Sequence, residues 1–318
     1  MYNEPIFLQP VFQEKIWGGS KLKTDYHYDI PSERTGEAWV ISAHPHGPSV
    51  IENGPLKGKT LADAWQDHGE LFNKSADHDE AYPLLVKMLD ANDDLSVQVH
   101  PDDRFAQDVE GVPYGKTECW YVLDAEPDSE LVLGHHAQTK EELEQLMVNG
   151  DWDHLLRRIK VQRGDFIYVP SGTIHAIGRG IVILEIQQSS DTTYRVYDYD
   201  RTDADGNKRE LHLDKAVNVI NVPHRVPDLQ QKEHVSGGLT MKQLVKNDYF
   251  SVRHWLLSGA TKQTLEDDFL QVSVIEGEAT LRLHGKSFTI QKGMHFILPH
   301  GIEAFELSGE AEFIVSSV

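Results

Sequence analysis

The stretch "RGDFIYVPSGTIHAIG", residues 163–178, decides the fold. It joins a short apolar run to the spacing Gly, five residues, Pro, one residue, Gly, and this spacing recurs in "KGMHFILPHGIEAFEL", residues 292–307. Five positions after the proline, the first copy has His175 and the second has Ala304. Glycine permits a tight turn that most residues resist, and proline fixes the backbone beside it. We therefore expect one turn between β-strands to occur twice, with an imidazole in only one copy.

Short β-type runs dominate the rest of the chain. Turn residues separate them every 8–12 positions or so, the spacing expected of an all-β sandwich or barrel. The runs cover residues 82–89, 95–100, 119–124, 130–134, 165–170, 180–188, 251–257, 270–277, 279–285 and 312–318. Gly-rich turns are expected to join three short strands within 274–293.

Helical patterns are few. We expect helices over 60–72, 139–159 and 213–220, the second opened by a capping pattern of Thr139 and Glu142 and split at Gly150. Residues 223–238 are polar, with two prolines and a Gly-Gly pair, and are predicted to form an interdomain linker. The expected organisation is a unit over 1–222, with a small helical insertion at about 138–160, and a smaller β unit over 239–318.

Composition and charge indicate which partners and which location to expect. The formal charge of −21, from 51 acidic and 30 basic residues, argues against nucleic acid or an anionic membrane surface as the main partner. Cys119 is the only cysteine, so an intrachain disulfide is impossible and a cytoplasmic location is expected. The first 19 residues lack the pattern of a signal peptide, and no apolar run approaches the ~20 residues of a membrane span.

Several residues have the types and spacing of metal ligands. Gln98 and His100 lie two positions apart, so in a strand their side chains share one face. Glu118 opens another strand, in which Cys119 faces the other way, and His175 follows the turn at 170–172. Two His and one Glu, supported by a Gln, suit a divalent metal of the zinc type, and the same set also suits Fe(II). Other histidines in polar or turn-rich surroundings are interpreted as non-ligands: His44, His46, His135 and His136.

Several of these segments resemble known motifs. "GDFIYVPSGTIHAIG" resembles the second conserved motif of cupins, the jelly-roll (double-stranded β-helix) metal-binding barrels. "SVQVHPDD" (96–103) is similar to the Gln-x-His-Pro segment of type I phosphomannose isomerases. Five further segments resemble that family's motifs in order: "KIWGG" (15–19), "GEAWVISAHP" (36–45), "PLLVKMLDA" (83–91), "GKTECWYVL" (115–123) and "ILEIQQSSDTTYRVYD" (183–198).

The resemblance implies a mainly β chain with two cupin-type jelly-roll barrels. It implies an enzyme that interconverts mannose 6-phosphate and fructose 6-phosphate with one Zn²⁺ per chain. The implied zinc ligands are Gln98, His100, Glu118 and His175. The implied active-site residues are Lys116, Glu185 and Arg195, with Trp17 and Lys116 near the sugar. The second barrel is expected to hold no metal, because Ala304 replaces the histidine there.

The expected reaction passes through a cis-enediol(ate), for which a metal stabilises charge and a base moves a proton between two carbons. Glu185 is the first candidate base and a metal-bound hydroxide is the alternative, while Arg201 is an alternative to Arg195. Two other functions stay open from the residues alone: an Fe(II)-dependent cupin oxygenase and a non-catalytic sugar-binding cupin.

Overall fold

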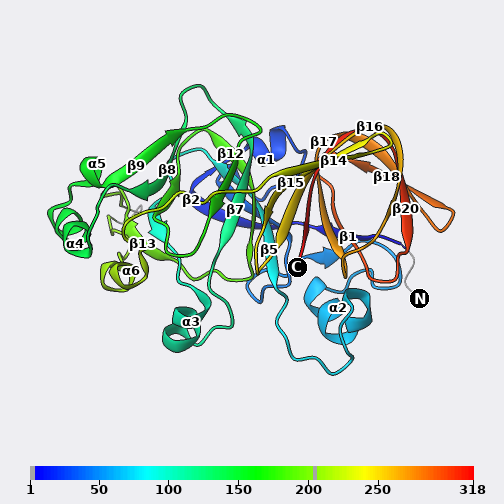
Figure 1. The fold of residues 1–318 in the computed structure, drawn as a ribbon, viewed down its shortest axis with the longest axis horizontal. Helices are drawn as coiled ribbons and strands as arrows, with labels where there is room; N and C mark the ends of the chain where they lie inside the picture. The colour runs from blue at the N-terminus through cyan, green and yellow to red at the C-terminus, as the bar shows by residue number, and fades with distance from the viewer. Residues whose placement is uncertain (1–3, 203–205) are drawn as a thin grey trace.

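The computed structural model describes residues 4–202 and 206–318. Two β units lie side by side along the long axis of the molecule, one built mostly from the N-terminal part of the chain and the other mostly from the C-terminal part (Figure 1). Their sheets are antiparallel. The expectation of a mainly β chain is therefore confirmed.

The first unit contains two sheets. One has the strand order β10-β7-β12-β5-β3-β2 and the other β13-β6-β11-β8-β9. The six strands of the first are β2 Val11–Gly19, β3 Thr35–Ile41, β5 Leu84–Ala91, β7 Glu118–Ala125, β10 Phe166–Val169 and β12 Ile181–Gln188. The five strands of the second are β6 Val97–Val99, β8 Glu130–His135, β9 Leu156–Lys160, β11 His175–Ile177 and β13 Tyr194–Tyr197. One buried cluster takes side chains from both sheets, among them Trp120, Ile183, Leu133 and Ile177.

The period of two along each strand decides which residues face this interior. On β7, Trp120 packs in the cluster between the two sheets, whereas Cys119 packs in a different cluster on the opposite face. On β12, Ile183 faces inward and Leu184 outward. Cys119 is buried and points away from the interior, as expected.

The second unit is a nine-stranded sheet with the path β14-β15-β16-β20-β17-β19-β1-β4, and β18 pairs with β17. Its strands are β1 Ile6–Gln9, β4 Val50–Ile51, β14 Lys232–Ser236, β15 Leu239–Lys246, β16 Ser251–Thr264, β17 Leu270–Leu283, β18 Lys286–Gln291, β19 His295–Leu298 and β20 Ala304–Ser317. Strands β1 and β4 come from the N-terminal part of the chain, and Ile6 lies opposite Ile297. This pairing ties the start of the chain to the C-terminal unit.

The repeated spacing builds the same turn in both units. Gly172 and Gly301 have φ values of 79° and 88°, in the left-handed region that favours glycine. A Cβ on Gly172 would lie 2.6 Å from the Val219 carbonyl oxygen, so only glycine fits. His175 is the first residue of β11, and Ala304 is the first residue of β20. The two residues therefore occupy corresponding positions, as the sequence predicted.

The helices are short. They are α1 Lys21–Thr24, α2 Leu61–Asp67, α3 Asp103–Phe105, α4 Lys140–Asn149, α5 Trp152–Leu155 and α6 Leu213–Val219, with the helical turns η1 Gly69–Phe72 and η2 Ala106–Glu110. The helix expected over 213–220 is confirmed as α6, whereas the one expected over 60–72 is divided at His68 into α2 and η1. The Thr139 side chain caps α4 by accepting from the Glu142 N–H. Gly150 ends α4 with φ 67°, which confirms the split. No helix in the described part of the chain is long and apolar enough to cross a membrane.

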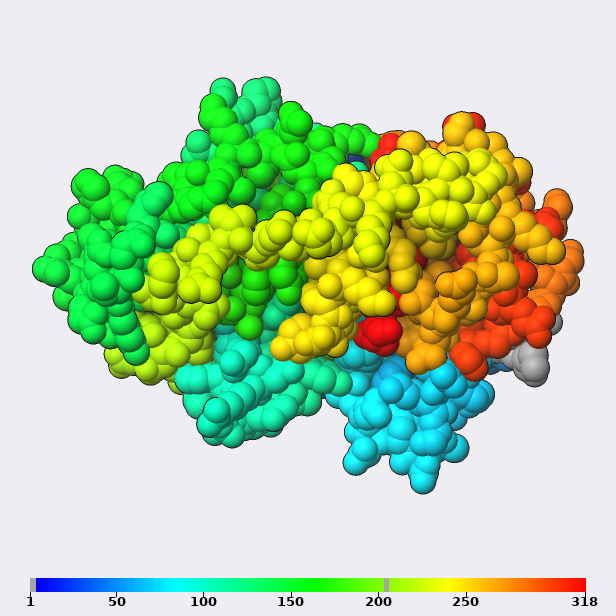
Figure 2. Space-filling view, in the orientation of Figure 1, coloured from blue at the N-terminus to red at the C-terminus, as the bar shows by residue number. Residues whose placement is uncertain are grey.

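Three local expectations were wrong. Residues 156–160 form strand β9 on β8, because pairing with a sheet edge overrides the helical pattern. The expected linker contains strand β14, and only residues 221–231 cross the surface between the units, none of them fully buried (Figure 2). The expected turn near Gly277 is an irregularity within the continuous strand β17, where the register shifts between Val274 and Glu276.

Candidate metal centre and active-site pocket

Three ionisable side chains meet in the interior of the first unit. The Nε2 atom of His100 lies 3.5 Å from one carboxylate oxygen of Glu118, and the Nε2 atom of His175 lies 3.4 Å from the other. All three side chains are at most 1% exposed. One cation between them would therefore be reached by two imidazoles and a carboxylate.

Strand pairing adds Gln98 to this group. In register, Gln98 on β6 lies opposite His175 on β11, and on its other side it lies opposite Arg195 on β13. Gln98 and His100 share a face of the chain because they are two positions apart. The four residues that the resemblance implies as ligands are thus brought to one place.

The chemistry of these donors fits a divalent metal. Nδ1 of His100 lies 2.9 Å from the Thr192 carbonyl oxygen, and Nδ1 of His175 lies 2.9 Å from that of Thr173. A carbonyl oxygen only accepts, so each Nδ1 carries the proton and leaves the Nε2 lone pair for a metal. Burial and the nearby Lys116 ammonium lower the pKa of His175 to about 4, so this imidazole is neutral. Within the described residues, the buried Glu118 Oε1 and His175 Nε2 atoms lack any hydrogen-bond partner, as expected for atoms that a metal engages.

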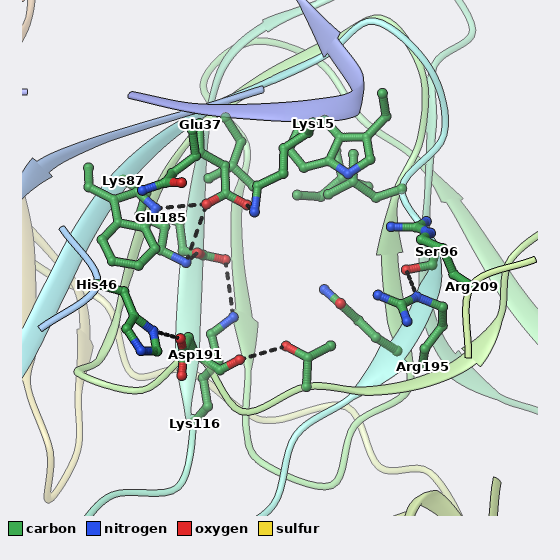
Figure 3. Close-up of a pocket in the computed structure, with 18 residues that line it drawn as sticks. Lys15, Glu37, His46, Lys87, Ser96, Lys116, Glu185, Asp191, Arg195 and Arg209 are labelled. Atoms are coloured by element: carbon green, nitrogen blue, oxygen red, sulfur yellow. Dashed lines mark hydrogen bonds and ion pairs between the residues drawn. The ribbon is translucent and has the colours of Figure 1, made fainter. Parts of the chain in front are cut away.

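A cavity of about 360 Å³ lies beside this centre and reaches it through Gln98 and Lys116, which line the cavity (Figure 3). Most of its walls are polar, and they come from both sheets of the first unit. The lining residues are Gln13, Lys15, Trp17, Glu37, Trp39, His46, Lys87, Leu89, Leu95, Ser96, Gln98, Lys116, Ile177, Glu185, Asp191, Thr193, Arg195 and Arg209. The predicted residues Trp17, Gln98, Lys116, Glu185 and Arg195 are all among them.

Glu185 lies between two buried lysines. Its carboxylate oxygens are 3.9 Å from Nζ of Lys116 and 3.7 Å from Nζ of Lys87, and it accepts a hydrogen bond of 3.0 Å from the Trp120 indole N–H. Burial and the negative charge of Glu118 raise the pKa of Glu185. A carboxylate that is buried, oriented and less acidic than usual has the properties of a general base.

Lys116 links Glu185 to the metal centre. Its Nζ atom lies 2.6 Å from Glu118 and 3.1 Å from Nε2 of His100. Burial opposes the ammonium charge, yet Glu118 and Glu185 outweigh it and raise the pKa of Lys116. Lys116 is therefore a fixed positive charge between the candidate metal ligands and the candidate base.

Glu37 extends the same series of charges. It lies 3.9 Å from Lys87 and 3.3 Å from Lys15, and it accepts a 2.7 Å hydrogen bond from the Trp39 indole N–H. Burial opposes its charge, but Lys87 and Lys15 lower the pKa of Glu37 to about 2. Acidic and basic groups thus alternate across one wall of the cavity, from Lys15 to the metal centre.

Arg195 and Arg209 form the facing wall (Figure 3). Arg195 donates to the Ser96 hydroxyl at 3.3 Å and to the Glu210 carbonyl at 2.9 Å. Arg209 donates two hydrogen bonds, of 2.7 and 2.6 Å, to the Asp198 carboxylate. Arg201 also pairs with Asp198, but it does not line the cavity.

Sequence reasoning did not single out Lys87, Glu37, Asp191 or Arg209 as site residues. The sequence does offer a signal for Lys87 and Glu37, because each is a charged residue in a short run that is mostly apolar. All residues of these runs are buried in β5 and β3. A charge at such a position requires a partner or a function. Arg209 and Asp191 lie in polar loops, where charge is ordinary, and the sequence offers no comparable signal.

Known proteins similar to this chain are mannose-6-phosphate isomerases. The family described as "Phosphomannose isomerase type I, catalytic domain" matches residues 6–142, and "Mannose-6-phosphate isomerase, cupin domain" matches residues 240–318. Mannose-6-phosphate isomerase ManA of Bacillus subtilis is 50% identical over 317 residues, covering 99% of each chain. The mannose-6-phosphate isomerase of Streptococcus mutans is 49% identical over 314 residues, covering 98% of each chain.

A solved structure agrees with these sequence matches. The crystal structure of mannose 6-phosphate isomerase from Bacillus subtilis superposes with a TM-score of 0.94 at 48% identity, over 99% of each chain. The similarity therefore spans both units, including β7 and β11, which carry Glu118 and His175, and His100, the residue after β6. The chain belongs to the type I phosphomannose isomerase family.

Proposed function

We propose that this chain is a zinc-dependent mannose-6-phosphate isomerase that interconverts mannose 6-phosphate and fructose 6-phosphate through a cis-enediol(ate). The observation that carries the proposal is the juxtaposition of two groups through Lys116, whose Nζ atom lies 2.6 Å from Glu118 and 3.9 Å from Glu185. The centre formed by His100, Glu118 and His175, with Gln98 beside it, adjoins the buried Glu185. A Lewis acid beside a base is the combination that moving a proton between adjacent carbons requires.

Gln98, His100, Glu118 and His175 would hold the metal, and Zn²⁺ there would polarise the substrate oxygens next to the reacting carbons. Glu185 is proposed as the base that takes the proton from one carbon and returns it to the next. The Trp120 indole fixes one of its oxygens, so the carboxylate keeps a single orientation. Lys116 is proposed to stabilise negative charge on the substrate oxygens, because its ammonium is buried and fixed in place.

The phosphate group is proposed to bind Arg195 and Arg209. Both guanidinium groups are oriented by protein acceptors, and they lie across the cavity from Lys87 and Glu185 (Figure 3). Oriented guanidinium groups suit a phosphate dianion. This arrangement would place the phosphate end of a hexose phosphate at one wall and its carbonyl end at the other. Trp17, buried between the sheets, would line the sugar pocket.

The test is an assay that couples fructose 6-phosphate production from mannose 6-phosphate to a recorded signal. Activity should be lost in excess chelator and return with stoichiometric Zn²⁺. Elemental analysis of protein purified without added metal should find about one zinc per chain. Full activity in the chelated protein would contradict the proposal.

The same experiment separates the other functions of a cupin site. Stoichiometric iron together with oxygen uptake would indicate an oxygenase, because two His and one carboxylate also suit Fe(II). Binding of the hexose phosphate without turnover would indicate a sugar-binding protein.

A further inference from the structure

Two histidines and an aspartate form a second cluster at the rim of the cavity. His44 and His46 lie in the loop after β3, and Asp191 lies in the loop after β12. Nδ1 of His46 is 2.6 Å from one oxygen of Asp191, and Nε2 of His44 is 3.8 Å from the other (Figure 3 shows the first of these). The cluster thus joins two loops that are far apart in the sequence.

The spacing indicates hydrogen bonding instead of a second metal site. A tetrahedral zinc with bonds of about 2.0–2.1 Å keeps its ligand atoms roughly 3.4 Å apart. The Nε2 atoms of His100 and His175 lie at such distances, 3.5 and 3.4 Å, from the carboxylate oxygens of Glu118. The His46–Asp191 separation of 2.6 Å is that of a hydrogen bond. The His46 backbone N–H also donates to Nδ1 of His44, which leaves the proton of a neutral His44 on Nε2, toward Asp191. The Nε2–H group of His44 therefore faces the carboxylate, but at 3.8 Å it is too far away for a hydrogen bond, so His46 alone holds Asp191.

The loop that carries Asp191 has a direct bond to the metal centre. The Thr192 carbonyl, one residue on, accepts from Nδ1 of His100 at 2.9 Å. The loop is also fixed from within, because the buried Gln187 amide donates to the Ser190 carbonyl at 2.6 Å. At the rim of the cavity, Asp191 connects this loop to the loop after β3, which carries His44 and His46.

From these contacts we infer that Asp191, held by His46, is a positioning residue for the metal ligand His100. The His46 imidazole fixes the carboxylate, the carboxylate fixes the loop, and the Thr192 carbonyl keeps the His100 proton on Nδ1. The lone pair of Nε2 then points at the metal position. The inference rests on the proposed metal centre and adds a residue that controls how tightly the metal is held.

Loss of Asp191 should lower the affinity of the protein for zinc. Loss of a group that orients a metal-bound histidine typically costs 10- to 100-fold in affinity. Asp191 acts through one further residue, so Asp191→Ala should weaken zinc binding by about tenfold, the lower end of that range. His46→Gln keeps an amide donor for Asp191 and should bind zinc as the wild type does, whereas His46→Ala should not.

The experiment is a competition for Zn²⁺ between the full-length protein and a chromophoric chelator of known affinity. The matched control is Asp151→Ala, because Asp151 pairs with His154 at the same 2.6 Å but lies away from the cavity. Asp151→Ala should leave the affinity unchanged. Circular dichroism and thermal melting establish that each variant is folded, and the exposed His46 variants serve even where Asp191→Ala is unstable.

The outcomes separate this inference from the proposed function. A wild-type chain that binds no zinc overturns the metal centre, and this inference with it. Wild-type zinc binding that is unchanged in both Asp191→Ala and His46→Ala overturns the inference alone. A raised KM for mannose 6-phosphate at unchanged zinc affinity would instead make Asp191 a substrate contact, and it too would overturn the positioning role.

Discussion

His175 lies directly opposite Gln98, in register across β11 and β6. The corresponding position in the second unit is Ala304, the first residue of β20, whose partner in register is Thr264. The same turn thus places a candidate metal ligand opposite Gln98 in one unit, and a methyl group opposite a threonine in the other. The difference between the units lies in what each turn meets across the sheet.

Replacing His175 by alanine should abolish zinc binding and isomerase activity while leaving the fold intact. The substitution removes one ligand, but the turn is maintained by Gly172 and Pro170, which remain. We expect zinc content to fall from about one ion per chain to nearly none, measured by elemental analysis, with an unchanged circular dichroism spectrum. Ala304→His is the counterpart, and it should add no zinc because its partner in register is Thr264, where His175 has Gln98. A second tightly bound ion in that variant would contradict the assignment.

Replacing Lys87 by methionine should destabilise the protein and reduce activity together. Lys87 is buried and lies within 4 Å of both Glu37 and Glu185, so its loss leaves two buried carboxylates without their shared partner. Removal of one member of a buried ion pair costs about 3–5 kcal/mol. Glu185, the proposed base, would also lose a lysine that positions it. Loss of a positioned base typically costs on the order of 100-fold or more in rate. Urea unfolding and the coupled assay measure the two effects.

Lys15→Met is the control for that substitution. Lys15 also pairs with Glu37, at 3.3 Å, but its side chain is 35% exposed. Partly exposed pairs of this kind contribute less than about 1 kcal/mol. If Lys15→Met and Lys87→Met destabilise the protein equally, the burial of the charge is not the cause.

Replacing Arg209 by leucine should raise KM for mannose 6-phosphate with a smaller effect on kcat. Hydrogen bonds to a charged group contribute about 1.5–3 kcal/mol, which corresponds to a change on the order of 10- to 100-fold. The inhibition constant of inorganic phosphate should rise in parallel. Arg201→Leu is the matched control, because Arg201 shares the Asp198 partner without lining the cavity. A similar KM change in both variants would show that Asp198, and not the phosphate, is what Arg209 serves.

The alternation of side chains along β-strands made part of this site predictable. Gln98 and His100 had to share a face, and Cys119 had to oppose Glu118, because strand geometry has a period of two. The pairing of β3 with β5 and of β5 with β12 was not predictable in the same way. That pairing alone brings Glu37, Lys87 and Glu185 together, from positions far apart in the chain. Their charges were visible in the sequence, but their partners were not.

The errors in the fold have a similar origin. Residues 156–160 continue a helical pattern, yet pairing with the edge of β8 decides their conformation. Strand β1 belongs by sequence to the first unit, yet it completes the sheet of the second by pairing with β19. Both outcomes depend on contacts between distant segments, which local patterns do not record.

The unfolding free energy should fall in acid partly because of His295, which is buried where the two units meet. Its ring nitrogens lie 2.9 Å from the Ser273 hydroxyl and 2.7 Å from the Tyr28 hydroxyl, and Tyr28 donates to the Gly293 carbonyl at 2.8 Å. Burial lowers the pKa of His295 from 6.5 to about 3. The unfolded chain therefore binds a proton between these pH values that the folded chain does not.

Because the unfolded chain binds this extra proton, the unfolding free energy falls as the pH is lowered. The contribution of His295 is complete above pH 6.5 and is lost as the pH falls toward 3, at about 1.4 kcal/mol for each pH unit. His295→Asn should remove this slope, so its unfolding free energy should decline less steeply than that of the wild type between pH 6.5 and 4. Urea unfolding at several pH values measures the two slopes. His154→Asn, at an exposed position, should keep the wild-type slope or steepen it, because the pKa of His154 is raised by Asp151. If wild type and His295→Asn decline in parallel, His295 is protonated in the folded protein and the predicted burial penalty is absent.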